Sequence, residues 1–536
     1  MVNSLSRMLA DAAHVPTGEV IETDLCIIGA GPAGITLARE LAGHDIRVCV
    51  LESGDHDLKP EMLALTKGES IGRPYFPLFE TRARAFGGST RLWPEEDQFR
   101  IRPLDPIDFE TREGIPHSGW PFSREHLDPF YDRAYDICAV SDPDFEIEKW
   151  ETDRTPRLPL VNDDVYTTLF LFSDKTDVFP DYMGALRQAN NVSLLLHANV
   201  VELVPDSSGT SIGHVEVAGL WTSAFTVKAR AFVLAAGGIE NARLLLASRR
   251  HHEAGLGNEN DLVGRYFMEH LRIQSGLLMP RSTDIVDRAG LYSRHLVNGS
   301  KIVGVLVLSP DVLRRQGLLN SAVYLREATE VTTSETFRSM ATIADSLRRQ
   351  RRPDDGSLGS HLSTVARHPV QAARILASRI GLDREQRRLI QLTIQSEQAP
   401  NPSSRVTLSD DLDPLGYPLA RLSWQLTDLD YESVRRTQSA IDKAARNAGV
   451  GRMEQMLGTE EPPVAIRGHW HHMGTTRMHS DPRRGVVDPN CRVHTITNLY
   501  VAGSSVFPTG GYANPTVTIV ALALRLADHL KTKTWA

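Results

Sequence analysis

This sequence of 536 residues lacks the features that would mark several other classes of protein. Its four cysteines are scattered and form no CxxC pair, so neither a disulfide framework nor a zinc site of common spacing is expected. No apolar run reaches the ~18 residues of a membrane-spanning helix, and no basic start followed by an apolar stretch marks a secretory signal. The formal charge of −8 argues against nucleic acid as the main partner. These absences predict a cytoplasmic protein with reduced thiols and no membrane span.

The length and composition predict an ordinary globular protein of more than one domain. A chain of 536 residues is too long for one hydrophobic core, so two or three domains are expected, which can be interleaved. A hydrophobic content of 41% and a charged content of 24% are typical of such proteins.

The stretch 24–54 is the most informative part of the chain. A short apolar run, 25–28, is followed by three glycines in GxGxxG spacing, a predicted helix, a second apolar run at 48–51 and a glutamate. This order is typical of a βαβ unit that binds a dinucleotide, with the pyrophosphate at the helix N-terminus and the ribose on the acid. A glycine turn that binds nothing is the alternative. The acid disfavours a 2′-phosphate and leaves NAD or FAD. The residues concerned are Gly29, Gly31, Gly34 and Glu52.

Three later segments could complete the same site. The first is the run FGGSTRLW at 86–93, whose backbone can approach a flat ring closely. The second is AAGG at 235–238, which joins a predicted strand to a helix. The third is the end of the chain, where a strand at 499–501 and the run GGYANPT precede an apolar helix predicted over 516–530. Ordinary glycine turns would explain each segment alone.

Four histidines lie close together near the C-terminal end, at positions 469, 471, 472 and 479. Their spacing matches none of the common zinc frames, so no metal is predicted. Between 272 and 464, strand-like runs alternate with long helices, which predicts an antiparallel sheet with helices on one side. Within it, the arginine-rich run 348–352 is interpreted as a solvated helix end. A docking surface is the alternative.

Taken together, these motifs resemble those of the glucose–methanol–choline (GMC) oxidoreductases. The resemblance rests on GAGPAG with Glu52, GGSTRLW, AAGGIENARLLLAS, VGRYFMEH, and the pair HHMGTTRM and GGYANPTVT. The last pair looks most like pyranose oxidases and bacterial glycoside 3-oxidases. The resemblance implies a Rossmann-type FAD-binding domain, 1–271 and 465–536, interleaved with an antiparallel-sheet-plus-helices substrate domain, 272–464, which has a helical insertion at about 330–395.

The resemblance also implies roles for individual residues. His471 would be the base and Asn514 its partner, while hydride passes from a CHOH group to flavin N5. Leu92 stands where some members bind FAD covalently through a histidine, so non-covalent FAD is expected. The residues expected around the cofactor are Gly29, Gly31, Gly34, Glu52, Gly88, Ser89, Thr90, Leu92, Val200, Ala236, Gly237, Asn241, Gly503, Pro515 and Thr516.

The substrate implied by the resemblance is a sugar or glycoside, oxidised to the ketone. Gln398 and Asn401 are the candidate hydroxyl-binding groups, although turn chemistry would explain them nearly as well. Oxidation of a non-sugar alcohol or polyol is the alternative, and a flavin-fold lyase or photoenzyme is a more distant one. A pure NAD dehydrogenase would leave the GG loop and the C-terminal return unexplained. The electron acceptor, O2 or quinone, and the oligomeric state are left open.

Overall fold

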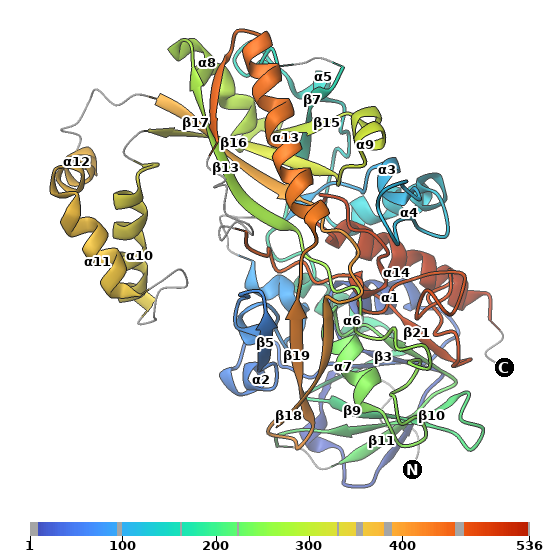
Figure 1. Ribbon diagram of the computed structural model, residues 1–536. Helices are drawn as coiled ribbons and strands as arrows, with labels where there is room; N and C mark the ends of the chain where they lie inside the picture. The colour runs from blue at the N-terminus through green and yellow to red at the C-terminus, as the bar shows by residue number, and fades with distance from the viewer. Residues whose placement is uncertain are drawn as a thin grey trace.

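The computed structural model describes residues 9–93, 99–160, 163–221, 224–329, 332–349, 357–379, 388–455 and 466–533. Figure 1 shows two parts stacked along the long axis of the molecule, with both chain ends in the lower part and a three-helix arm projecting from the upper part. No helix among the described residues is long and apolar enough to cross a membrane.

The lower part is built on a six-stranded parallel sheet. Its central strands, β3 (Leu25–Ile28) and β4 (Val48–Leu51), are buried at every position, as their unbroken apolar runs predict. The sheet brings together segments far apart in sequence, and its strands occur in the order β1 (Leu9–Asp11), β8 (Val192–Leu196), β4, β3, β12 (Ala231–Leu234) and β21 (Leu499–Val501). The C-terminal strand β21 therefore lies two strands away from the first glycine motif.

Helices α1 and α14 pack on each other beside this sheet. α1 (Pro32–Leu41) follows β3, and α14 (Thr516–Lys531) follows β21. Because both helices follow parallel strands, their N-termini lie at the carboxyl edge of the sheet, where ligands bind in open α/β folds. α4 (Arg124–Ile137) also packs against α14.

Two smaller sheets flank the parallel one. The segment 212–228 forms an antiparallel pair of strands within a four-stranded sheet, whose order is β2 (Val20–Glu22), β11 (Phe225–Lys228), β10 (Ile212–Ala218) and β9 (Asn199–Pro205). A three-stranded sheet contains β18 (Arg405–Leu412), β19 (Pro418–Trp424) and β5 (Gly68–Gly72). α7 (Glu240–Ala247) contacts β18, β19 and β9.

The upper part is a largely antiparallel eight-stranded sheet, with α13 (Asp428–Asn447) lying along it (Figure 1). Two of its strands, β6 and β7, come from 100–172, so the sheet also uses residues well before position 272. The order is β20 (Gly451–Gln455), β13 (Leu271–Pro280), β17 (Arg388–Ser396), β16 (Ser321–Thr329), β15 (Ser300–Leu308), β7 (Val165–Phe172) and β6 (Arg100–Ile101), and β14 (His295–Val297) pairs with β15.

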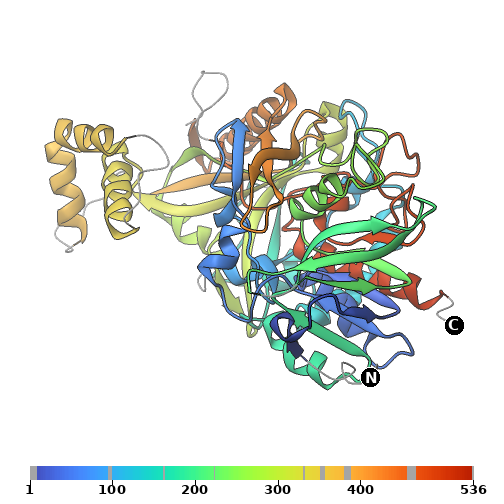
Figure 2. The same cartoon turned by 90° about the horizontal axis from the view of Figure 1, so that it is seen from below.

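The helical arm connects β16 to β17 and projects from the body in two views at right angles (Figure 1 and Figure 2). It consists of α10 (Glu335–Arg349), α11 (Leu358–Arg367) and α12 (Pro369–Arg379), within the insertion expected at about 330–395. The arginine-rich run begins at the end of α10, and its positions 350–352 lie outside the described residues.

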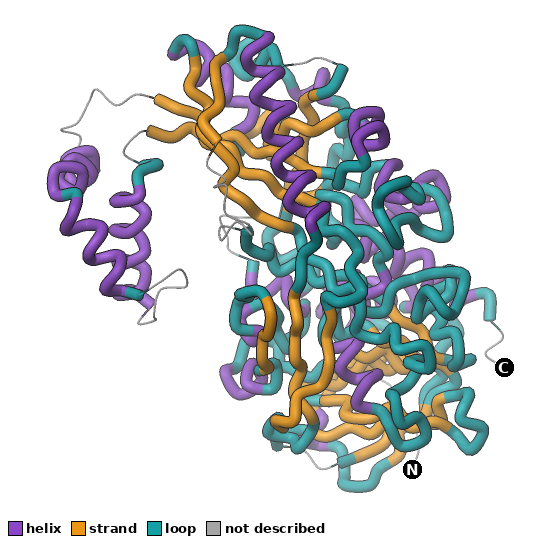
Figure 3. Tube along the Cα trace, in the orientation of Figure 1, coloured by secondary structure: helices purple, strands orange, loops and turns teal. Residues whose placement is uncertain are grey.

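The remaining helices are short, and loops make up much of the surface between the two parts (Figure 3). They are α2 (Pro60–Ala64), α3 (Pro106–Phe109), α5 (Ile147–Trp150), α6 (Met183–Gln188), α8 (Thr283–Arg288) and α9 (Pro310–Gln316).

Candidate active site

A cavity of about 1760 Å³ lies between the carboxyl edge of the parallel sheet and one face of the eight-stranded sheet. Its lower wall consists of the loops after β3, β12 and β21 and the N-termini of α1 and α14. Segments from the first 100 residues and from the last 70 therefore meet around one space.

The glycines of the lower wall leave room that side chains would otherwise fill. A Cβ on Gly34 would overlap the carbonyl oxygen of Gly29, so α1 packs directly on the preceding turn. A Cβ on Gly88 would lie 2.9 Å from the Cα of Gly31, so the two glycine loops approach each other through backbone alone. This backbone cradle fits the close approach of a pyrophosphate.

Gly237 and Gly503 border the open space itself. Both have positive φ, +89° and +110°, and a Cβ on either would meet no atom within 4 Å. Both also line the cavity. Any side chain at these positions would enter the space that a dinucleotide requires, so the cradle fits a large flat cofactor.

Glu52 lies at the end of β4 beside this cradle. Its carboxylate accepts hydrogen bonds of 2.8 Å from the backbone N–H groups of Ala30 and Gly54. Burial raises the pKa of Glu52 above its ordinary value, and these hydrogen bonds oppose that effect. The residue is 4% exposed and lines the cavity, at the place a ribose would occupy in a dinucleotide fold.

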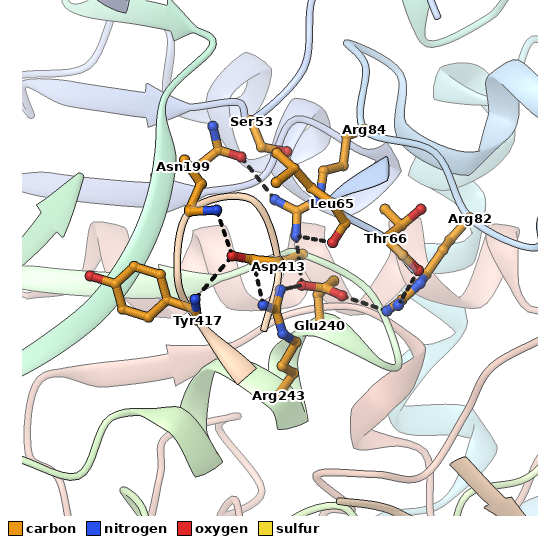
Figure 4. Close-up of polar contacts among 12 residues, drawn as sticks. Ser53, Leu65, Thr66, Arg82, Arg84, Asn199, Glu240, Arg243, Asp413 and Tyr417 are labelled. Atoms are coloured by element: carbon orange, nitrogen blue, oxygen red, sulfur yellow. Dashed lines mark hydrogen bonds and ion pairs between the residues drawn. The ribbon is translucent and has the colours of Figure 1, made fainter. Parts of the chain in front are cut away.

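A buried ion-pair network closes the same end of the cavity (Figure 4). Glu240 on α7 forms ion pairs with Arg82, Arg84 and Arg243, and Arg243 reaches Asp413 at 2.6 Å. The pKa of Glu240 is lowered to about 2, because the three guanidinium groups outweigh the desolvation that would raise it. The network ties the segment before the GG loop to α7 and to the turn between β18 and β19.

Most residues expected from the sequence lie around this one cavity. The lining includes Gly29, Gly31, Glu52, Gly88, Ser89, Thr90, Leu92, Val200, Ala236, Gly237, His471, Gly503, Asn514, Pro515 and Thr516. Gly34 lies behind it, under α1.

Besides Gly34, three expected residues lie outside the lining. Asn241 is fully buried, where its amide accepts from Ala236 N–H and donates to Ser505 Oγ, so it supports the loop rather than facing the cavity. Gln398 donates to the carbonyl of Gln425, and Asn401 accepts from Ser403 N–H within a turn. The turn chemistry that the sequence also allowed accounts for this bond of Asn401, whereas Gln398 bonds to residues distant in the sequence.

A buried carboxylate positions the histidine segment. Oε2 of Glu269 accepts the backbone N–H groups of His270, His469 and His471 at 3.2, 3.0 and 2.9 Å. Its Oε1 accepts the hydroxyl of Tyr75, which also lies 2.9 Å from His472 Nε2. One side chain just before β13 therefore fixes the backbone on both sides of position 470.

The tautomer of His471 follows from its contact with His270. The two Nδ1 atoms of these histidines are 2.7 Å apart, and His270 Nε2 faces the carbonyl oxygen of Gly510 at 3.4 Å. A carbonyl oxygen only accepts, so the proton of neutral His270 lies on Nε2 and its Nδ1 accepts from His471. His471 therefore keeps an unprotonated Nε2.

Burial keeps these imidazoles uncharged. Desolvation lowers the pKa of His270 to about 4 and that of His471 well below the ordinary value of 6.5. The charges that histidines 469, 270 and 472 would carry, and that of Arg100, lower the pKa of His471 further. A neutral imidazole with a free ring nitrogen is suited to accept a proton.

A chain of contacts connects His471 to Asn514. The ring of His469 packs edge-on against His471, with centroids 4.8 Å apart, and its Nε2 accepts from Arg272 at 3.1 Å. Arg272 is the cross-strand partner of Gln395, whose Nε2 donates to Asn514 Oδ1 at 3.2 Å. Because Oδ1 is engaged, the Nδ2 group of Asn514 is left to donate toward the cavity.

Sequence reasoning did not assign roles to Tyr75, Glu269, His270 or Gln395. The motif VGRYFMEH, which carried part of the family resemblance, contains two of them. Tyr75 lies in an irregular aromatic segment with no periodic signal, and Gln395 lies on a strand whose inward face only the sheet register reveals. Among the described residues, no group of three or more His, Cys, Asp or Glu side chains could hold a metal ion.

The fold and this cavity fit the binding of a dinucleotide, with the eight-stranded sheet facing the same space. The sequence model of the GMC oxidoreductase family's C-terminal part matches residues 400–523, and that of the lycopene cyclase proteins matches 24–63, within the first βαβ unit. These matches show that the chain is related to the GMC oxidoreductases, a family whose members bind FAD and act on alcohols.

Two of the similar proteins align with nearly the whole chain, and a third aligns with about a quarter of it. A 2-methyl-1,2-propanediol dehydrogenase from Mycolicibacterium austroafricanum is 25% identical over 95% of both chains. A 6'''-hydroxyparomomycin C oxidase from Streptomyces lividus is 26% identical over 95% of this chain and 92% of its own. A C-glycoside 3-oxidase from Microbacterium trichothecenolyticum is 34% identical, but over only 24% of each chain.

Solved structures show the same fold. A pyridoxine 4-oxidase structure from Mesorbium loti covers 96% of this chain and 100% of its own at 18% identity, with a TM-score of 0.54. The predicted fold class, a Rossmann-type domain interleaved with an antiparallel-sheet domain, is confirmed.

Proposed function

We propose that this protein oxidises a CHOH group of a sugar or glycoside to the ketone, using non-covalently bound FAD and His471 as the base. The observation that carries the proposal is the hydrogen bond between the Nδ1 atoms of His270 and His471. It leaves a neutral imidazole with its free Nε2 in a residue that lines the cavity.

His471 takes the hydroxyl proton of the substrate on Nε2. Its pKa lies well below 6.5, so the base is ready at neutral pH without first losing a proton. General-base assistance of this kind contributes about 10²- to 10⁴-fold to the rate.

Asn514 orients the substrate oxygen. The contact from Gln395 Nε2 to its Oδ1 fixes the amide, so that Nδ2 donates to the oxygen that His471 deprotonates. Gln395 is itself held by a 2.7 Å bond to the carbonyl of Tyr512.

FAD supplies the two-electron acceptor when it is bound. The glycine cradle, Glu52 and the N-termini of α1 and α14 would hold it, and the helix N-termini favour negative charge. Leu92 lines the cavity and has no nucleophilic atom, which supports non-covalent binding. Acid precipitation of the protein should therefore release the flavin into the supernatant.

The upper wall suits a polyhydroxylated substrate. Gln274, Gln391 and Thr393 line the cavity from neighbouring strands, and their amide and hydroxyl groups can bind sugar hydroxyls. The relatives named as a hydroxyparomomycin C oxidase and a C-glycoside 3-oxidase agree with this class. The diol dehydrogenase, which aligns over 95% of both chains, favours a small diol as the second candidate.

The test is anaerobic reduction of the flavin by a panel of sugars, glycosides and diols, followed by loss of the visible flavin band. We expect His471→Ala to retain its flavin but to be reduced at least about 100-fold more slowly. His479→Ala is the matched control, since His479 is absent from the cavity lining. Reduction of His471→Ala at the wild-type rate would exclude His471 as the base, and reduction by diols alone would favour the second candidate.

A further inference from the structure

One face of the eight-stranded sheet forms the upper wall of the cavity. The register pairs Arg272 with Gln395, Gln274 with Thr393, and Arg326 with Gln391 across neighbouring strands. Because side chains alternate along a strand, these residues share a face.

Arginines dominate the charge on this side of the cavity. Among the described residues that line this side, Glu327 is the one carboxylate, and it is paired with Arg388 at 2.6 Å. The other acidic residues of the lining lie at the dinucleotide end of the cavity. Glu240 and Asp413 belong to the ion-pair network there, and Glu52 accepts hydrogen bonds from backbone amides. Six arginines line the substrate side of the cavity: Arg100, Arg272, Arg294, Arg326, Arg338 and Arg467. This excess stands out in a chain of net charge −8.

Three of these arginines have no acidic partner among the described residues. Arg294, Arg326 and Arg338 form no ion pair within the described part of the chain, and the guanidinium of Arg294 lies over the ring of Phe172, 5.8 Å from its centroid. An uncompensated guanidinium beside a cavity is suited to bind a carboxylate or phosphate through two parallel hydrogen bonds.

We infer that the substrate is an anionic sugar, one that carries a carboxylate or phosphate group in addition to the alcohol that is oxidised. The inference rests on the proposed function, because it names the substrate class of the same site. Arg272 is the cross-strand partner of Gln395, and Gln395 donates a hydrogen bond to Asn514. Arg326 lies opposite Gln391, four residues further along β17, or about 13 Å. The arginines therefore extend from the reacting group to the far end of the sheet face.

The first experiment compares matched substrates on the holoenzyme. Methyl β-glucoside, methyl β-glucuronide and glucose 6-phosphate are used as reductants of the flavin, at low and at high salt. We expect the charged sugars to have a kcat/KM about 10- to 100-fold higher than the neutral one, and this advantage to shrink as salt screens the charges. The two charged sugars distinguish a carboxylate from a phosphate. A neutral or amino sugar that is used equally well or better would overturn the inference.

The second experiment does not depend on turnover. Binding of glucuronate and of glucose 6-phosphate to the oxidised holoenzyme is measured by calorimetry for wild type and for the Arg326→Gln, Arg338→Gln double variant. We expect the variant to bind at least about 10-fold more weakly. Arg315→Gln is the control, since Arg315 pairs with Asp164 on the surface and is absent from the lining. Equal binding by the double variant and the wild type would overturn the inference.

The outcomes separate the two proposals. Arginine-dependent binding without reduction by any sugar would support the anion site and count against sugar oxidation. Oxidation of neutral sugars without anion binding would support the proposed function and overturn the inference.

Discussion

Replacing Glu269 by glutamine should change how the stability of the protein depends on pH. The carboxyl group is fully buried, and burial raises its pKa from the ordinary 4.5 to about 7, against the opposing effect of its hydrogen bonds. Between these two values the folded protein binds more protons than the unfolded chain. The free energy of unfolding therefore falls as pH rises from 4.5 through 7.

The size of the effect follows from the two pKa values. At about 1.4 kcal/mol per pH unit, the gap corresponds to about 3 kcal/mol. An unfolding entropy of about 2.1 cal/mol/K per residue makes each kcal/mol worth about 1 °C in a chain of this length. Glutamine does not titrate, so the apparent Tm of Glu269→Gln minus that of wild type should rise by about 3 °C between about pH 4.5 and 8.

Differential scanning calorimetry of the two holoenzymes across this range measures the difference. The matched control is Glu110→Gln, because Glu110 is paired with Arg314 at 2.8 Å and its pKa is lowered chiefly by that hydrogen bond. Its carboxyl is ionised in both states from about pH 5 upward, so its Tm offset should stay constant. A constant offset for Glu269→Gln as well would refute the reasoning.

The cofactor cradle, the ion-pair network and the histidine pair each allow a further test. Gly237 and Gly43 both have positive φ, +89° and +79°, but of the two only Gly237 borders the cavity, so Gly237→Ala should lose FAD on gel filtration and Gly43→Ala should retain it. Glu240→Gln should lower the apparent Tm by roughly 3–5 °C, because it removes the negative charge with which three buried guanidinium groups are paired. The rate of flavin reduction should show no acid limb near pH 6.5, since the pKa of His471 lies well below that value; a limb there would contradict the assignment. His270→Leu should slow reduction while flavin content stays unchanged, and an unchanged rate would remove its role in fixing the tautomer.

The parallel core could be predicted because its signals are local. Strands buried on both faces read as unbroken apolar runs, and β3 and β4 end where the sequence predicts. The membership of β6 and β7 in the eight-stranded sheet could not be predicted in the same way. β7 pairs with β15, more than a hundred residues later, and nothing within either strand specifies that partner.

In the candidate site, too, the residues in local motifs could be predicted from the sequence, and those that depend on strand pairing could not. Residues of the glycine motifs line the cavity, as do His471 and Asn514, which the family resemblance supplied. The substrate wall was placed at Gln398, which instead bonds to Gln425 and accepts from the N–H of residue 269. The cavity residues Gln391 and Thr393 lie a few positions earlier on β17, where only the sheet register shows which face looks inward.

The position of His471, the proposed base, depends on a strained backbone at Trp470 and on the buried carboxylate of Glu269. Trp470 has a φ of +60°, a left-handed conformation that costs about 1–2 kcal/mol for a residue with a side chain. That turn points the N–H groups of His469 and His471 at the same carboxylate oxygen of Glu269. Successive N–H groups converging in this way form an anion-binding nest, here occupied by a side chain of the protein itself. Without the carboxylate of Glu269, nothing would compensate the strained backbone of Trp470. Without that backbone turn, the ring of His471 would not lie between His270 and the cavity. The imidazole that we propose as the base is therefore positioned by Glu269, from the residues just before β13, rather than by a helix or strand of its own.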